Sequence, residues 1–230
     1  MFSLLVCGIL VASASAGTPC CIDRQFEARM GEVGGAIFTQ NGHSKPALIN
    51  GENVIHYDFY SRKMLVEATL NFTNGSSVTT NIVVDDVANK MFVLTKDGCF
   101  ETKSTLPFLT SCIPDDAVKV RESYIGSGVS AIPFTTWQFL VPATGNVLRL
   151  SVTDKGCIPI FESLFGTIQG GSSDILYILT NFQPGIKKPD AFLVPNNCKP
   201  LPSNDVPDVV RRSIDKAEHL TKHFMMGNTL

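Results

Sequence analysis

The chain has 230 residues, a formal net charge of −2, 44% hydrophobic residues and 17% charged residues. This near-neutral balance, without clustered Lys and Arg, excludes an ordinary nucleic-acid-binding protein. The apolar content also excludes a disordered chain, and the length allows one large all-β domain or two small domains.

Residues 1–16 have the pattern of a signal peptide. The apolar run Leu4–Ala12 is too short to span a bilayer, and Ala14-Ser15-Ala16 is typical of a cleavage site. The alternative, a buried N-terminal strand, fits this pattern less well. We therefore expect a secreted or luminal protein that begins at residue 17.

Cleavage would remove Cys7 and leave an even number of cysteines in an oxidising compartment. The six are Cys20, Cys21, Cys99, Cys112, Cys157 and Cys198. They predict disulfides, but their spacing alone does not select among the many pairings. Zinc is the weaker alternative because the sequence has no C-x-x-C pair.

Short segments rich in Val, Ile, Phe, Thr and Tyr, bounded by Gly, Pro, Asn or Asp, predict ten strands. The segments are Val33–Thr39, Asn53–Phe59, Lys63–Leu70, Val78–Val84, Lys90–Leu94, Val118–Ile125, Thr136–Val141, Val147–Val152, Ile158–Phe165 and Ile175–Phe182. Their close turns favour an antiparallel sandwich or barrel. The even spacing favours a single domain over residues 17–200.

Two glycosylation sequons lie in a turn-rich stretch between predicted strands. They begin at Asn71 and Asn74, in Asn71-Phe72-Thr73 and Asn74-Gly75-Ser76. A hairpin tip on a secreted chain suits a glycan, although the two acceptors are too close for both to be occupied easily.

Residues 201–230 predict a linker followed by an amphipathic helix. The linker is Lys199–Ser203, and Asp205 is a suitable N-cap. The apolar stripe of the helix consists of Val206, Val209, Val210, Ile214, Ala217, Leu220 and Phe224. His219 and His223 are spaced to bind a metal, but a solvated face is the better reading because no third ligand is near.

The sequence offers no catalytic constellation. Gly126–Ala131 fits G-x-G-x-x-A formally, but Ile132-Pro133-Phe134 does not start the helix that a phosphate site needs. The pairs Asp85-Asp86 and Asp115-Asp116 are better read as turn residues than as an acid/base pair, and two carboxylates are too few for calcium. We expect a protein that is not an enzyme.

Several motifs resemble the ependymin and ependymin-related proteins. They are Pro19-Cys20-Cys21, Tyr57-Asp58, Cys112-Ile113-Pro114-Asp115, Tyr124-Ile125-Gly126, Trp137, Cys157-Ile158-Pro159-Ile160 and, most specific, Gly185–Pro195 followed by Cys198. The resemblance covers about residues 19–200. The paired cysteines and the Cys-Ile-Pro-Asp element look like invertebrate-type members, whereas Phe26 lies where the family often has Trp.

The resemblance implies two antiparallel sheets curled into a half-open barrel, similar to bacterial lipoprotein carriers, around a deep apolar pocket. It also implies a homodimeric, secreted or lysosomal glycoprotein linked to calcium binding, cell–matrix adhesion and carriage of lipid-like molecules. By position in the family, Cys99 would pair with Cys198 and Cys157 with Cys20 or Cys21. Cys112 would take the remaining partner.

These observations lead to the hypothesis of a secreted binder of fatty-acid or lipid-like ligands, without a cofactor other than Ca²⁺. The candidate wall residues are Trp137, Phe139, Leu148, Leu150, Phe161 and Phe165. The alternative is a calcium-binding extracellular-matrix or adhesion glycoprotein without a ligand pocket.

Overall fold

The computed structural model of the chain describes residues 19–40, 43–71, 77–96, 98–104, 111–141, 145–168 and 171–201. The predicted signal peptide, the acceptor Asn74 and the predicted C-terminal helix with His219 and His223 lie outside the described residues.

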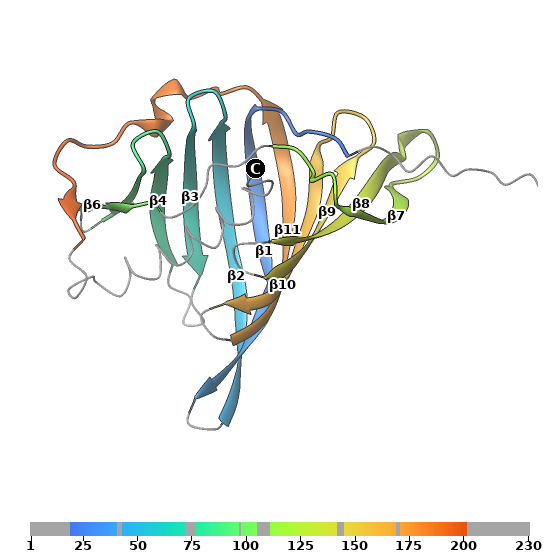
Figure 1. Cartoon of the computed structure of the whole chain (residues 1–230), viewed down its shortest axis with the longest axis horizontal. Coiled ribbons are helices and arrows are strands. Elements are labelled where there is room, and N and C mark those ends of the chain that lie inside the picture. Colours follow the sequence, from blue (N-terminus) through green and yellow to red (C-terminus); the bar gives the residue numbers. More distant parts are fainter. Residues whose placement is uncertain are drawn as a thin grey trace, which may run out of the picture.

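The described strands form one twelve-stranded sheet (Figure 1). In chain order they are β1 (Gln25–Gln40), β2 (His43–Asp58), β3 (Lys63–Asn71), β4 (Ser77–Asp85), β5 (Lys90–Thr95), β6 (Gly98–Lys103), β7 (Val118–Ile125), β8 (Ile132–Val141), β9 (Asn146–Thr153), β10 (Pro159–Ile168), β11 (Gly171–Pro184) and β12 (Lys199–Pro200). Two short 3₁₀ helices, η1 (Gly128–Ser130) and η2 (Pro189–Phe192), lie in connections.

The sheet runs in the order β12-β6-β5-β4-β3-β2-β1-β11-β10-β9-β8-β7. Neighbours are antiparallel except β12 and β6, which are parallel. The all-β antiparallel prediction is confirmed, but the expectation of two separate sheets is wrong. The reason is β1, which pairs with β2 along one edge and with β11 along the other and so joins the two halves.

All ten predicted strands are present, and β7 has the predicted bounds. The structure adds β6 and β12, and it makes β1 and β2 much longer than predicted. The long β1–β2 hairpin extends beyond its neighbours at the bottom of Figure 1. The predicted linker is corrected at its start, because Lys199 and Pro200 form β12 beside β6.

A glycine permits the close approach of β1 and β11. A Cβ added at Gly34 would lie 2.4 Å from the carbonyl oxygen of Asp174. Any side chain here would push apart the pair of strands that joins the two halves of the sheet. Only glycine, which has no Cβ, lets the two backbones approach this closely at position 34.

The turn predicted at Asp85-Asp86 is confirmed. The carboxylate of Asp85 accepts a hydrogen bond from the backbone N–H of Ala88 at 2.9 Å, and Asn89 has a positive φ of 55°. Asp115 and Asp116 also lie in a turn, and η1 is too short to serve as a phosphate-binding helix.

Three disulfides join the six cysteines, in the pairs Cys20–Cys157, Cys21–Cys112 and Cys99–Cys198. The Cys99–Cys198 pair implied by the family resemblance is therefore confirmed. Of the two partners left open for Cys157, Cys20 and Cys21, the structure has Cys20. The first two bridges attach the segment before β1 to distant connections, and the third holds the start of β12 against β6.

Candidate ligand-binding site

Alternate side chains divide the sheet into two faces, and we call the face that carries Ile55, Leu148 and Leu164 the inner face. Its buried apolar side chains continue across nine neighbouring strands, from β5 to β8. Representative members are Met91, Ile82, Val66, Ile55, Met30, Ile175, Leu164, Leu148 and Trp137. The inner face is therefore one continuous apolar surface.

Four of the six predicted wall residues lie together on the inner face. Trp137 and Phe139 of β8 are directly opposite Leu150 and Leu148 of β9, and all four side chains are buried. Cross-strand pairing places such side chains about 5 Å apart. These four candidates therefore share one face of the sheet, and their contact with a ligand stays a prediction.

Phe161 and Phe165 do not belong to this cluster. In β10 the residues that pair with Leu150 and Leu148 are Glu162 and Leu164, so both phenylalanines point to the opposite, outer face. Phe165 is 61% exposed there. The prediction was wrong on their position because hydrophobicity alone favours Phe over Glu on a buried face.

A row of polar side chains crosses the middle of the inner face, and sequence reasoning missed it. Glu162 of β10 pairs with Tyr177 of β11, and Tyr177 pairs with Glu32 of β1. Asn53 of β2 adjoins them, with its Nδ2 donating to Glu32 Oε2 at 3.4 Å. We call Glu162, Tyr177, Glu32 and Asn53 the polar row; all four are at most 4% exposed.

Burial changes the chemistry of this row. It raises the pKa of Glu162 to about 8, so the carboxyl group is largely protonated at neutral pH and is then a hydrogen-bond donor as well as an acceptor. Burial also raises the pKa of Tyr177, and the nearby carboxyl groups of Glu32 and Glu162 add to this effect. The row thus presents donors and acceptors within an apolar surface.

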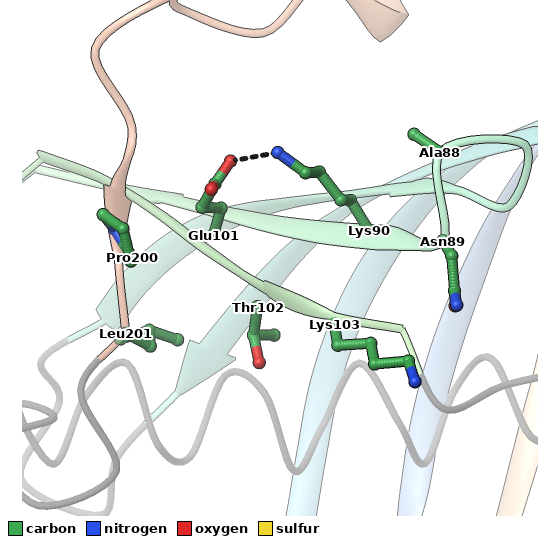
Figure 2. Close-up of a pocket in the computed structure, with 8 residues that line it drawn as sticks. All are labelled: Ala88, Asn89, Lys90, Glu101, Thr102, Lys103, Pro200 and Leu201. Carbon is green, nitrogen blue, oxygen red and sulfur yellow. Dashed lines mark hydrogen bonds and ion pairs between the residues drawn. The ribbon is translucent and has the colours of Figure 1, made fainter.

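A separate hollow of about 470 Å³ lies at the other end of the sheet, beside β5, β6 and β12 (Figure 2). It is lined by Ala88, Asn89, Lys90, Glu101, Thr102, Lys103, Pro200 and Leu201. Lys90 Nζ and Glu101 Oε2 form an ion pair of 2.9 Å within it. Its charged and polar lining does not suit an alkyl chain, so it is not the predicted apolar pocket.

Metal ligands do not gather in the part of the chain that the structure describes. No group of three or more His, Cys, Asp or Glu side chains is arranged there to hold an ion. The described residues also contain no helix with the length and apolar character needed to cross a bilayer.

The chain matches the family model for ependymin over residues 74–198. This match covers more than half of the sequence. The chain belongs to the ependymin family. Members of this family are generally not enzymes, and the family together with the three disulfides is consistent with a secreted protein.

Two fish ependymins illustrate the relationship. The ependymin of Notemigonus crysoleucas is 29% identical over 111 residues, which cover 46% of this chain and 50% of the fish protein. The ependymin of Clupea harengus is 29% identical over 103 residues, which cover 42% of this chain and 47% of the fish protein. The chain thus spans about half the length of the curated relatives it matches.

Two solved structures also resemble the chain, each at 8% sequence identity. An uncharacterized conserved protein from Thermus thermophilus has a TM-score of 0.48, with 78% of this chain and 90% of that chain covered. A LolA superfamily protein from Nitrosomonas europaea has a TM-score of 0.31, with 82% of this chain and 90% of that chain covered.

Proposed function

We propose that this ependymin-family protein is a secreted carrier that binds a fatty-acid or lipid-like ligand against the inner face of its sheet. The observation that carries the proposal is the continuous apolar surface across nine strands. An alkyl chain that leaves water for such a surface gains about 25 cal/mol per Å² of buried apolar area.

The polar row supports an amphiphilic ligand. Ligand sites are mostly apolar with a few polar groups that fix orientation. In the register of the sheet Glu162 lies between Leu150 of β9 and Tyr177 of β11, and Leu164 is the next residue of β10 on the same face. An alkyl chain on the apolar surface would therefore have hydrogen-bonding groups beside it for its polar end.

The single tryptophan of the chain makes a direct test available. Trp137 is 5% exposed on the inner face, so its emission reports on this site alone. Titration with a fluorescent fatty acid should quench Trp137 by energy transfer, and an unlabelled fatty acid should reverse the quenching. Native mass spectrometry of the purified protein should show the same ligand as a stoichiometric mass increase.

A matched pair of variants separates the two faces. Phe139→Leu on the inner face should weaken ligand binding several-fold, whereas Phe165→Leu on the outer face should leave it unchanged. A protein that carries no lipid and shows no Trp137 response to any probe would contradict the proposal. That result would favour the alternative, an adhesion glycoprotein without a ligand pocket.

We also propose the calcium link and the glycan that the family resemblance implied. Calorimetry with Ca²⁺ should give a binding heat, and a chelator should lower the melting temperature. If neither effect is observed, calcium is removed from the proposal. Asn71 is the last residue of β3, and it pairs with Ser77 of β4. Enzymatic deglycosylation of the secreted protein should lower its mass, and Asn71→Gln should reproduce that loss.

A further inference from the structure

The polar row contains two carboxyl groups of the same sign within an apolar surface. Glu162 of β10 and Glu32 of β1 lie on either side of Tyr177 of β11. Their other neighbours on the inner face are apolar residues or glycine, such as Leu164 beside Glu162 and Met30 beside Glu32. None of the inner-face positions next to either carboxyl group in the described register carries Lys, Arg or His. This part of the inner face is therefore acidic.

The amide of Asn53 points independently to a hydrogen-bond donor. Its Nδ2 donates to Glu32 Oε2 at 3.4 Å, whereas its Oδ1 is buried and has no hydrogen-bond partner among the described residues. Asn53 is 0% exposed and pairs with Met30 of β1 and Ala68 of β3, whose side chains have no donor. Buried acceptors are nearly always hydrogen-bonded, so an exception needs an explanation. A ligand that donates a hydrogen bond fits this position.

The electrostatics of the row favour a positively charged group. Burial raises the pKa of Glu162 to about 8, and burial together with the two carboxyl groups raises the pKa of Tyr177. Both shifts show that further negative charge is unfavourable at this place in the sheet. A cation would have the opposite effect, because a buried carboxylate is stabilised by an opposite charge within hydrogen-bonding distance.

We propose that the polar end of the ligand is an ammonium group, so that the preferred ligand is a long-chain amine rather than a fatty acid. This inference rests on the proposed function, because it concerns the ligand that the inner face binds. An ammonium group has three donors and no acceptor. One N–H donates to Asn53 Oδ1 and another to the carboxylate of Glu32, which gives a charge-assisted hydrogen bond.

A fatty acid matches the same groups poorly. An ionised fatty acid has no donor for Asn53 Oδ1, and it adds a third acidic group beside Glu32 and Glu162. A long-chain alcohol is intermediate, because its hydroxyl group donates to Asn53 Oδ1 but carries no charge.

The alkyl chain of an amine has an apolar surface next to this position. Ile55 is the next residue of β2 on the inner face, and it pairs with Ala28 of β1 and Val66 of β3. All three side chains are buried. The donor-seeking amide and the surface for the alkyl chain are therefore contiguous, as a ligand with one polar end requires.

The test compares dodecylamine, dodecan-1-ol and dodecanoate, which share one alkyl chain and differ at the polar end. Calorimetric titration of the disulfide-intact protein at pH 7, below the micelle concentrations of the ligands, gives the three dissociation constants. Dodecylamine should bind at least about tenfold more tightly than dodecanoate, with dodecan-1-ol between them. This series needs no variant, so it decides the question even if substitutions in the row prevent folding.

A matched pair of variants assigns the preference to the polar row. Glu32→Gln keeps the shape of the side chain but removes its charge, and it should remove most of the preference for the amine over the acid. Glu52→Gln makes the same change on the outer face, where Glu52 pairs with Gly31, and should leave the preference unchanged. Asn53→Leu should weaken dodecylamine and dodecan-1-ol but not dodecanoate. Melting curves verify that each variant is folded.

The possible failures are distinguishable. Dodecanoate that binds as tightly as dodecylamine would overturn this inference and leave the proposed carrier function in place. Dodecan-1-ol that binds as tightly as dodecylamine would overturn the assignment of a cationic polar end, and a preference that persists in Glu32→Gln would overturn the role of the polar row. If none of the three ligands binds, the proposed function itself fails together with this inference.

Discussion

The inner and outer faces of the sheet each contain side chains that are usually found on the other kind of surface. The inner face is apolar but buries the carboxyl groups of Glu32 and Glu162. The outer face is exposed but carries Phe165, Leu140 and their apolar neighbours. The polar side chains on the inner face lie where we propose that the ligand binds.

The two faces also differ in how such side chains affect stability. A buried carboxyl group lowers the stability of the fold unless it is protonated or well hydrogen-bonded. The buried carboxyl groups of the inner face should therefore make stability depend on pH. The outer side chains already contact water in a single chain. Replacing them should therefore change the stability of the fold little.

The largest expected effect is the pH dependence from Glu162. Its pKa rises from 4.5 in the unfolded chain to about 8 in the folded protein, so the folded state retains a proton that the unfolded state loses. Stability should therefore fall as the pH rises from 4.5 to 8, by an upper limit of about 5 kcal/mol at 1.36 kcal/mol per unit. Urea unfolding at several pH values, with the disulfides intact, measures this slope.

The neutral variant Glu162→Gln should lack most of that slope. Glu52→Gln, at an exposed position on the outer face, is the control and should unfold like the wild type at every pH. Parallel stability profiles for wild type and Glu162→Gln would show that the inner face does not shift this carboxyl group.

Next in size is the contrast between two leucines on neighbouring strands. Leu148 of β9 is 1% exposed on the inner face, and Leu140 of β8 is 59% exposed on the outer face. Leu148→Ala should destabilise the fold by about 2–5 kcal/mol because it leaves a cavity, whereas Leu140→Ala should cost less than about 1 kcal/mol. Denaturant unfolding at low protein concentration, where association contributes little, compares them; equal losses would contradict the assignment of the faces.

The strands themselves were largely predictable from the sequence. Alternation placed Leu148, Leu150 and Val152 on one face, and turn residues bounded β7 at both ends. The length of β1 and β2 was not predictable because Gly31, Gly34, Gly35 and Pro46 are unfavourable in strands. Their pairing partners, rather than local preference, hold these residues in extended conformation.

The candidate site was predictable only in part. Trp137 and Phe139 alternate clearly within β8, so their common face follows from the sequence. In β10, either Phe161 and Phe165 or Glu162 and Leu164 could face inward, and the apolar pair is the better guess from hydrophobicity. Only the register between β9 and β10 decides this, and register is a property of the assembled sheet.

The smallest expected effect concerns a buried polar cluster on the outer face. His56 is 2% exposed, with Nδ1 3.1 Å from Glu27 Oε1 and Nε2 3.4 Å from Glu67 Oε1. Glu27 also accepts hydrogen bonds from the backbone N–H groups of Lys187 and Lys188, at 2.8 Å and 3.2 Å. This carboxylate therefore ties the segment after β11 to β1.

Glu27→Gln keeps an acceptor at this position but removes the charge, so it should cost about 1 kcal/mol at pH 7. Burial opposes ionisation of Glu27, but the hydrogen bonds from Lys187, Lys188 and His56 lower its pKa below 4.5. A lowered carboxyl pKa stabilises the fold above pH 4.5, and this contribution disappears as the pH falls through the folded-state pKa. The stability difference between wild type and Glu27→Gln should therefore shrink below pH 4.5. This trend is opposite to the one expected for Glu162, and a difference that grows on acidification would show that the charge of Glu27 does not stabilise the segment after β11.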